Sequence, residues 1–250
     1  MDIDTDIGGP LHRFPTTRHS AIVAAASDDE EVRQRALETI VASYWKPAYK
    51  YLRIKWQASN ENAKDLTQSF FLTAIEKSYF AGYDASKASF QTFFRTCLDR
   101  FVANQNKAEQ RLKRGGGASH LSLDFVGAES ELTNNLPAPE LNPEDFFHRE
   151  WVRSLFTLAV ETLQDRYHQS GRDIYFQLFE RYDLHDDGDS KVSYASLASE
   201  FELKTTDVTN YLAAARRDFR KILLEKVREL TGTEAEFQAE VRALLGTEAK

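Results

Sequence analysis

The sequence predicts an all-α protein in which two helical domains are joined by a flexible acidic linker. Apolar residues recur at helical spacing through most of the 250 residues, and no segment shows the alternation typical of a strand. The 6 prolines and 11 glycines are few and clustered, so they divide the chain at a few places. The pattern predicts a first domain at 10–117, a linker at 118–148, a second domain at 149–230 and an extension at 231–250.

Two helices are predicted early in the first domain. The helix at 36–55 has one apolar side, made of Leu37, Ile40, Tyr44 and Tyr51. Pro47 lies inside this helix and is expected to kink or divide it. The helix at 61–80 has an inner face made of Leu66, Phe70, Phe71, Ala74 and Ile75.

A third helix, from Phe90 to Arg114, has two different faces. Its apolar face is a predicted core, made of Phe90, Phe93, Phe94, Cys97, Leu98, Phe101 and Val102. A second stripe holds cationic and amide groups, namely Arg100, Asn104, Lys107, Arg111 and Arg114. This stripe is either an ordinary solvated face or a phosphate-binding face.

The segment 118–148 contains six acidic residues and no Lys or Arg. Prolines at 137, 139 and 143 interrupt it, and it lacks periodicity, so a flexible linker is expected. Two supporting helices follow in the second domain. Their apolar stripes are Val152, Leu155, Phe156, Ala159, Val160 and Leu163, and then Ile174, Leu178, Phe179 and Tyr182.

The segment from Tyr194 to Leu223 has a helix-turn-helix pattern. We expect its second helix to begin near Thr205 or Thr206, either of which can cap the free amides. The face opposite its apolar stripe suits a major groove and its phosphates, with Lys204, Thr205, Asn210, Arg216, Arg217 and Arg220. An ordinary helical hairpin is the alternative. Glu202 occupies the turn position often held by Gly, so it must either avoid or tolerate a positive φ.

Composition limits the function. The net charge of −7 is unusual for a protein that holds DNA alone, so DNA contact is expected only with a larger partner. The single Cys97 excludes an internal disulfide, and no metal site, cofactor or catalytic motif is expected. A calcium-like loop at 183–194 has Tyr194 where a bidentate Glu is needed. No membrane span or signal peptide is found, which predicts a cytoplasmic protein. Because no nucleophile elbow or P-loop is found either, we expect that the protein is not an enzyme.

Several motifs together resemble bacterial RNA polymerase sigma factors of the extracytoplasmic-function class. The segment N-A-K-D-L-T-Q-S-F-F at 62–71 resembles the D-A-E-D-L-x-Q-x-x-F signature of that family. The run at 90–114 is similar to the helix that recognises and melts the −10 element. The pattern L-A-x-x-F…V-x-x-Y-L-x-x-A-R-R is similar to the region that reads the −35 element. The resemblance covers about residues 14–227.

The resemblance implies core RNA polymerase, through its β′ clamp and β flap, and promoter DNA as partners. It implies a polymerase-binding surface made of Asp65, Leu66, Gln68 and Phe70. It implies −10 strand contacts by Arg100, Asn104, Lys107 and Arg111. It implies −35 contacts by Lys204, Thr205, Thr206 and Asn210, with Arg216 and Arg217 on phosphates.

The signature departs from the family pattern because Asn62, Lys64 and Ser69 replace acidic residues, which leaves Asp65. A basic clamp should therefore bind this helix weakly. Phosphorylation of Thr67 by a Ser/Thr kinase would add about −1.5 to −2 charges there. The chain in this respect resembles a kinase-activated group of the class. Ser59 and Ser69 are alternative acceptors, and Thr67 can also be a simple surface residue.

Two other functions remain open. An autonomous helix-turn-helix regulator would bind DNA without polymerase, and a helical scaffold would bind an acidic protein through its basic stripes. The extension has Phe237, Val241, Leu244 and Leu245 at helical spacing. We expect a short amphipathic helix there, which packs on either domain or binds a partner.

Overall fold

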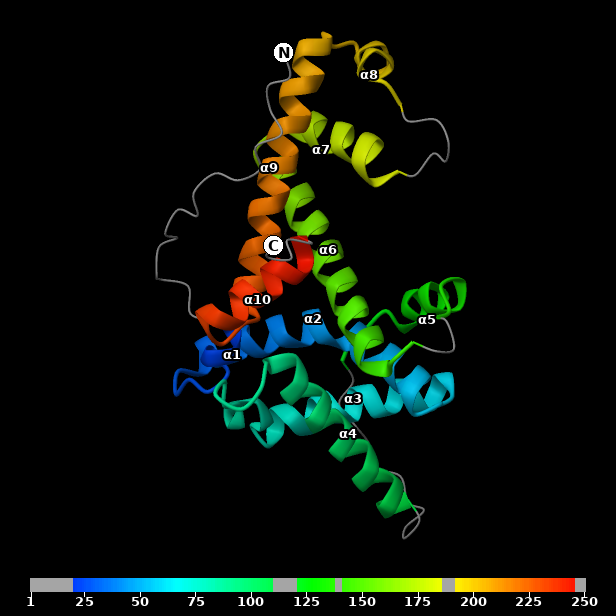
Figure 1. Ribbon diagram of the computed structural model, residues 1–250, viewed down its shortest axis with the longest axis vertical. Coiled ribbons are helices and arrows are strands. Elements are labelled where there is room, and N and C mark those ends of the chain that lie inside the picture. The colour runs from blue at the N-terminus through cyan, green and yellow to red at the C-terminus, as the bar shows by residue number, and fades with distance from the viewer. Residues whose placement is uncertain (1–19, 110–120, 138–140, 186–191, 246–250) are drawn as a thin grey trace.

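A computed structural model describes residues 20–109, 121–137, 141–185 and 192–245. The described residues form helices and no strand, so the predicted all-α class is confirmed (Figure 1). The elements are α1 (Ala21–Ala24), α2 (Glu30–Lys55), α3 (Asn60–Glu76), η1 (Tyr79–Gly82), α4 (Phe90–Glu109), α5 (Phe125–Asn134), α6 (Pro143–Gln169), α7 (Asp173–Phe179), η2 (Glu180–Leu184), α8 (Tyr194–Glu200), α9 (Thr205–Glu229) and α10 (Glu234–Leu245). None of these described helices combines the length and apolarity that crossing a bilayer requires.

Helix α2 is the central element of the lower body, where it packs against α1, α3, α5 and α6 (Figure 1). Asp29 begins the helix by accepting hydrogen bonds from the amides of Glu31 and Val32. Pro47 was expected to kink or divide this helix, but α2 runs through it without a break. The helix remains continuous because its buried side is packed along its length, from Ile40 to Leu52.

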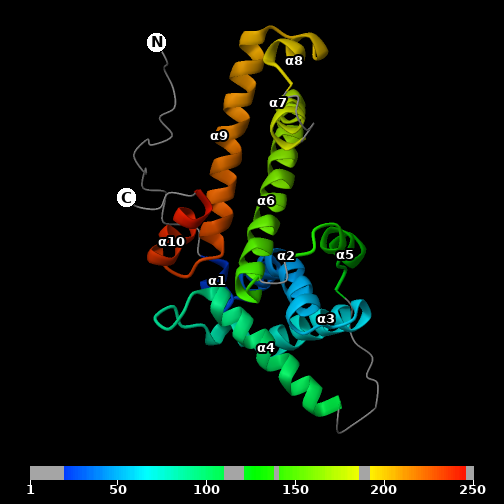
Figure 2. The ribbon, with the colours of Figure 1, turned by 45° about the vertical axis from the view of Figure 1, so that its right-hand side comes forward.

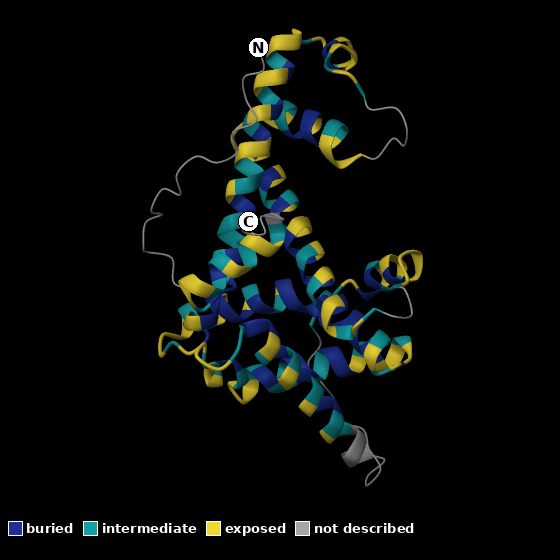
Figure 3. Ribbon diagram, in the orientation of Figure 1, coloured by how far each residue is buried: buried dark blue, intermediate teal, exposed yellow. Residues whose placement is uncertain are grey.

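Aromatic rings join α2, α4 and α6 in one core. The Tyr44 ring lies 4.6 Å from Phe94 and 6.3 Å from Trp151, measured between centroids. Phe94 lies 5.9 Å from Phe147 of α6. The predicted core role of Phe90 and Phe94 is confirmed, because both side chains are fully buried, whereas Phe93, predicted with them, is half-buried. Buried residues are concentrated along α2 (Figure 3). The two predicted domains therefore share one hydrophobic core.

The expected flexible linker is corrected by the structure. Part of the segment 118–148 is α5, and its end is the first turns of α6. Phe125 packs against the rings of Trp45 and Tyr49, at centroid distances of 5.5 and 5.3 Å. Two acidic residues of α5 then pair with cations of α2: Glu129 with Arg53 at 2.7 Å, and Glu131 with Lys46 at 2.8 Å.

Lys50 binds three elements together. Its ammonium lies 2.6 Å from Glu150 of α6 and 2.8 Å from Glu131 of α5. The Lys50 and Glu150 side chains are only 2% and 4% exposed. A charge this deeply buried requires its partner, because its hydration has been lost. The ion pair therefore fixes α6 to the body formed by α2 and α5.

The C-terminal half is a long antiparallel pair, α6 with α9 (Figures 1 and 2). With 27 and 25 residues, the two helices are each roughly 40 Å long at about 1.5 Å per residue. Hydrogen bonds from Tyr167 to Asp218 (2.8 Å) and from Arg166 to Glu225 (2.9 Å) link them. Helices α7 and α8 surround a small core at the far tip, made of Leu178, Leu197, Ala198, Val208 and Leu212.

Candidate nucleic-acid interface

The tip of the molecule presents the beginning of α9 beside α8 (Figure 2). Ser193 caps α8 by accepting a hydrogen bond from the Ser196 amide at 3.1 Å. Helix α9 begins at Thr205, as expected, with Asp207 in its first turn. The expected capping by Thr205 or Thr206 is wrong, because Lys204 is the capping residue and makes no side-chain cap. Both threonines already lie inside the helix.

The turn between α8 and α9 is closed by backbone hydrogen bonds. The Leu203 amide donates to the Ala198 carbonyl at 2.8 Å, the bond that ends a helix in a Schellman motif. Glu202 has φ of 54° at the left-handed position of this motif. The residue therefore tolerates the positive φ that glycine would adopt without steric strain.

Replacing Glu202 by Gly should raise the free energy of unfolding by about 1 kcal/mol, because it removes left-handed strain at one residue. Urea unfolding measured by circular dichroism checks this value. The control Glu202→Val should lower stability, since a β-branched residue fits this φ worst. A loss of stability in the Gly variant would contradict the assigned turn geometry.

Four side chains of the predicted DNA face are exposed at the start of α9: Lys204, which precedes its first turn, and Thr205, Thr206 and Asn210. Exposed residues predominate at this end of α9 (Figure 3). Arg217, two turns further along, is exposed as well. These residues are thus brought together on the outer side of the tip.

Arg216 is exposed, but its guanidinium is already paired with other residues of the chain. Its guanidinium pairs with both carboxylate oxygens of Asp183 at 2.9 Å, and also lies 3.3 Å from the Tyr194 hydroxyl. The Asp183 carboxylate raises the pKa of Arg216 further above its usual value. In this conformation Arg216 links α9 to η2 and α8, and a phosphate would have to compete with Asp183.

The signature helix α3 divides into a surface and a core side. Asp65 is exposed and Gln68 is half-buried, so both reach the surface. Leu66 and Phe70 are buried, and the Phe70 ring packs 5.3 Å from Phe94. Of the four predicted polymerase-binding residues, Leu66 and Phe70 therefore pack in the core beneath the surface that Asp65 and Gln68 reach.

Thr67 lies on the core side of α3. Its side chain is fully buried, and its hydroxyl donates to the Ala63 carbonyl at 2.7 Å. A kinase could reach this hydroxyl only after α3 moves away from its neighbours. Ser59 is exposed at the start of α3, where its hydroxyl accepts from the Asn62 amide at 3.3 Å, and Ser69 is half-buried.

On α4, Arg100 and Asn104 are exposed side by side along the predicted −10 face. Lys107 belongs to the α4 backbone, but its side chain, like Arg111 as a whole, lies outside the described residues.

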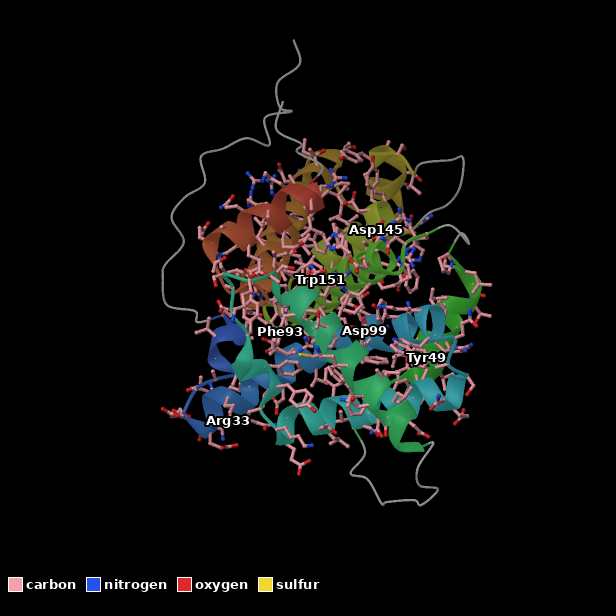
Figure 4. The ribbon with its side chains drawn as sticks, turned by 60° about the horizontal axis from the view of Figure 1, so that its bottom comes forward. Arg33, Tyr49, Phe93, Asp99, Asp145 and Trp151 are labelled. Carbon is pink, nitrogen blue, oxygen red and sulfur yellow. The ribbon has the colours of Figure 1, made fainter. Side chains whose placement is uncertain are left out.

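Sequence reasoning gave no role to Asp99, whose carboxylate connects α4 to the end of α2 (Figure 4). It accepts from the Trp56 indole at 2.9 Å, from the Lys55 ammonium at 2.8 Å and from the Tyr51 hydroxyl at 3.2 Å. Asp99 therefore fixes the middle of α4, and the Arg100 face projects from that fixed point. No sequence signal pairs it with residues more than 40 positions away.

In the described part of the chain, no group of three or more His, Cys, Asp or Glu residues could hold a metal ion. No family model, curated protein or solved structure matches the chain. Any functional assignment therefore depends on the residues themselves and on their arrangement.

Proposed function

We propose that this chain is a sigma factor that binds core RNA polymerase, through its β′ clamp and β flap, and directs it to promoters. One observation supports the proposal most. Two exposed polar and cationic faces lie at opposite ends of the molecule, one at the start of α9 and one on α4 (Figures 1 and 2). The α6–α9 pair, itself roughly 40 Å long, separates them. Such an arrangement suits a protein that contacts two separate DNA elements at once.

At the tip, α8 and α9 would form a helix-turn-helix that reads the −35 element. Thr205, Thr206 and Asn210 would face base edges in the major groove, where an Asn side chain can pair with adenine. Lys204 and Arg217 would contact phosphates, and Arg216 would join them only by leaving Asp183.

At the other end, the face of α4 would hold the −10 strand. Arg100 and Asn104, followed by Lys107 and Arg111, would bind phosphates and unstacked bases of a single strand. Holding that strand lowers the cost of opening the duplex, because the separated bases gain partners.

The polymerase would dock on α3. Asp65 provides an acidic group at the surface, whereas Lys64 pairs with Glu61 at 2.9 Å and brings a positive charge beside it. A basic clamp would find this surface only weakly complementary. Phosphorylation would strengthen it. Thr67 is our proposed acceptor on condition that α3 opens, and Ser59 and Ser69 are acceptors nearer the surface.

Replacing Asn210 by Ala should reduce discrimination between correct and altered −35 sequences by about 1–3 kcal/mol. Replacing Arg217 by Ala should instead weaken binding to all sequences and reduce the slope of log affinity against log salt by about 1. Fluorescence anisotropy with the polymerase complex measures both. Thr157→Ala, an exposed change on α6, should change neither. Equal losses on all sequences for Asn210→Ala would contradict base reading by this residue.

An electrophoretic mobility shift tests the proposal against an autonomous helix-turn-helix regulator. DNA from a randomised library, selected for binding with core polymerase, is mixed with the chain alone and with the chain plus core enzyme. The proposal expects a specific shift only in the presence of core enzyme. A specific shift by the chain alone would favour the autonomous regulator.

A further inference from the structure

The C-terminal helix α10 reaches back to the start of α4. The Glu236 carboxylate accepts a hydrogen bond from the Phe90 backbone amide at 2.7 Å. The Glu240 carboxylate accepts from the Gln91 side-chain amide at 2.9 Å. The first amides of a helix have no partner within it, and negative charge is favourable at that end. Helix α10 thus caps α4 from 146 residues away.

The loop before α4 is held by the same contact. The second oxygen of Glu236 accepts from the Tyr83 hydroxyl at 3.1 Å and from the Gly232 amide at 2.8 Å. A Cβ at Gly232 would lie 2.7 Å from the Tyr83 ring, so the α9–α10 turn and Tyr83 pack closer than any side chain there would allow. Phe237 is buried beside them and anchors α10 to the body.

Gln91 extends the connection to a third element. Its side chain is nearly buried, and its carbonyl oxygen lies 3.1 Å from His148 Nδ1 of α6. The chain Glu240–Gln91–His148 therefore joins α10, α4 and α6. An amide oriented by partners on both sides cannot rotate without losing both hydrogen bonds.

The surroundings of Glu240 make its charge unfavourable. Burial and the neighbouring Glu236 carboxylate raise the pKa of Glu240 to about 7. The buried Tyr44 of α2 also faces this cluster. Burial, followed by the charges of Glu240 and Glu236 and by Tyr83, raises the pKa of Tyr44. Burial, followed by the Arg95 charge on α4, lowers the pKa of His148, against an opposing effect of Asp145. His148 is therefore neutral where Glu240 titrates.

We propose that α10 is an intramolecular clamp on α4, in which Glu236 and Glu240 are positioning residues, and that ionisation of Glu240 loosens the clamp. The clamp is most stable below the ordinary Glu pKa of 4.5, and it weakens as the pH rises through about 7. One consequence rests on the proposed function: the clamp sets the orientation of α4, the helix proposed to hold the −10 strand.

The test measures the distance between α4 and α10 directly. Spin labels are placed at Thr92 and Ala239, both exposed, in a Cys97→Ala background. Pulsed electron paramagnetic resonance then gives the distance distribution near pH 6 and near pH 8.5. We expect one narrow distance at the lower pH. The clamped-to-open ratio should fall about tenfold at the higher pH, and a longer distance should emerge.

Three controls complete the design. Glu240→Gln should keep the narrow distance at both pH values, because an amide does not ionise. Glu236→Gln removes the neighbouring charge, so the loosening of the clamp should occur at lower pH. This variant tests the same mechanism if Glu240→Gln does not fold. Labels at Thr157 and Lys221, across the α6–α9 pair, should give the same distance at both pH values.

The clamp is overturned if the wild-type distribution is the same at both pH values, or if Glu240→Gln retains the wild-type response. The measurement contains neither DNA nor polymerase. A distance that does not change with pH would therefore overturn the clamp and not the proposed function. A failure to start transcription would overturn the proposed function and not the clamp.

Discussion

Replacing Lys50 by Met should lower the free energy of unfolding by about 4 kcal/mol. The ammonium of Lys50 is buried against Glu150, whose side chain is 4% exposed. Without it, Glu150 keeps, among the residues that the structure describes, the outer Arg153 at 2.6 Å to offset its lost hydration. Urea unfolding followed by circular dichroism measures the loss.

Lys46→Met is the matched control. Lys46 pairs with the same α5 residue, Glu131, but from a position that is 23% exposed at the side chain. Its loss should cost less than about 1 kcal/mol, because solvent already screens the pair. The double change Lys50→Met with Glu150→Leu should recover most of the stability, since no unpaired charge stays buried. A small effect of Lys50→Met alone would mean that α6 is not fixed to α2 as described.

Replacing Thr67 by Glu should also be strongly destabilising, by at least about 3 kcal/mol, because it forces a carboxylate into the core beneath α3. Thr67→Val keeps the shape and removes only the hydrogen bond to Ala63, so it should change stability by about 1 kcal/mol or less. Thermal and urea unfolding of both variants check the difference. A fully stable Thr67→Glu protein would show that α3 can open at little cost.

Ser59→Glu provides a surface comparison for the same helix. Ser59 is exposed and caps the start of α3. A Glu there loses that hydroxyl cap but adds a negative charge where it is favourable, so stability should change by less than about 1 kcal/mol. If phosphate activates the protein at Thr67, hydrogen exchange across residues 63–70 must accelerate on modification. If exchange stays slow while polymerase binding increases, the phosphate is on a surface residue.

The helical class and most helix positions could be predicted from apolar spacing alone. The core side of α4 and the start of α9 at Thr205 followed from local pattern. The burial of Thr67 could also have been found, because Ala63, Thr67, Phe70 and Ala74 recur at spacings of four and three residues, which is one helical face.

Other features needed the tertiary structure. Residues 118–148 were expected to form a flexible linker because they hold acidic residues without Lys or Arg and lack periodicity, but the cations that pair with Glu129 and Glu131 lie some 80 residues earlier in α2. Arg216 was predicted to face DNA. Its partner Asp183 lies on another element, so the pattern of α9 alone gave no sign of the ion pair. The contacts of Glu236 and Glu240 with α4 join residues 146 and 149 positions apart, and local periodicity contains no signal for them.

We propose above all that the chain starts transcription by bringing core polymerase to a promoter. Run-off transcription with purified bacterial core enzyme, the chain and the library-selected DNA tests this proposal, with kinase-treated and untreated protein compared. We expect a discrete transcript that depends on the chain and is reduced by Asn210→Ala. If neither form of the protein yields a transcript or associates with core enzyme, the chain is not a sigma factor.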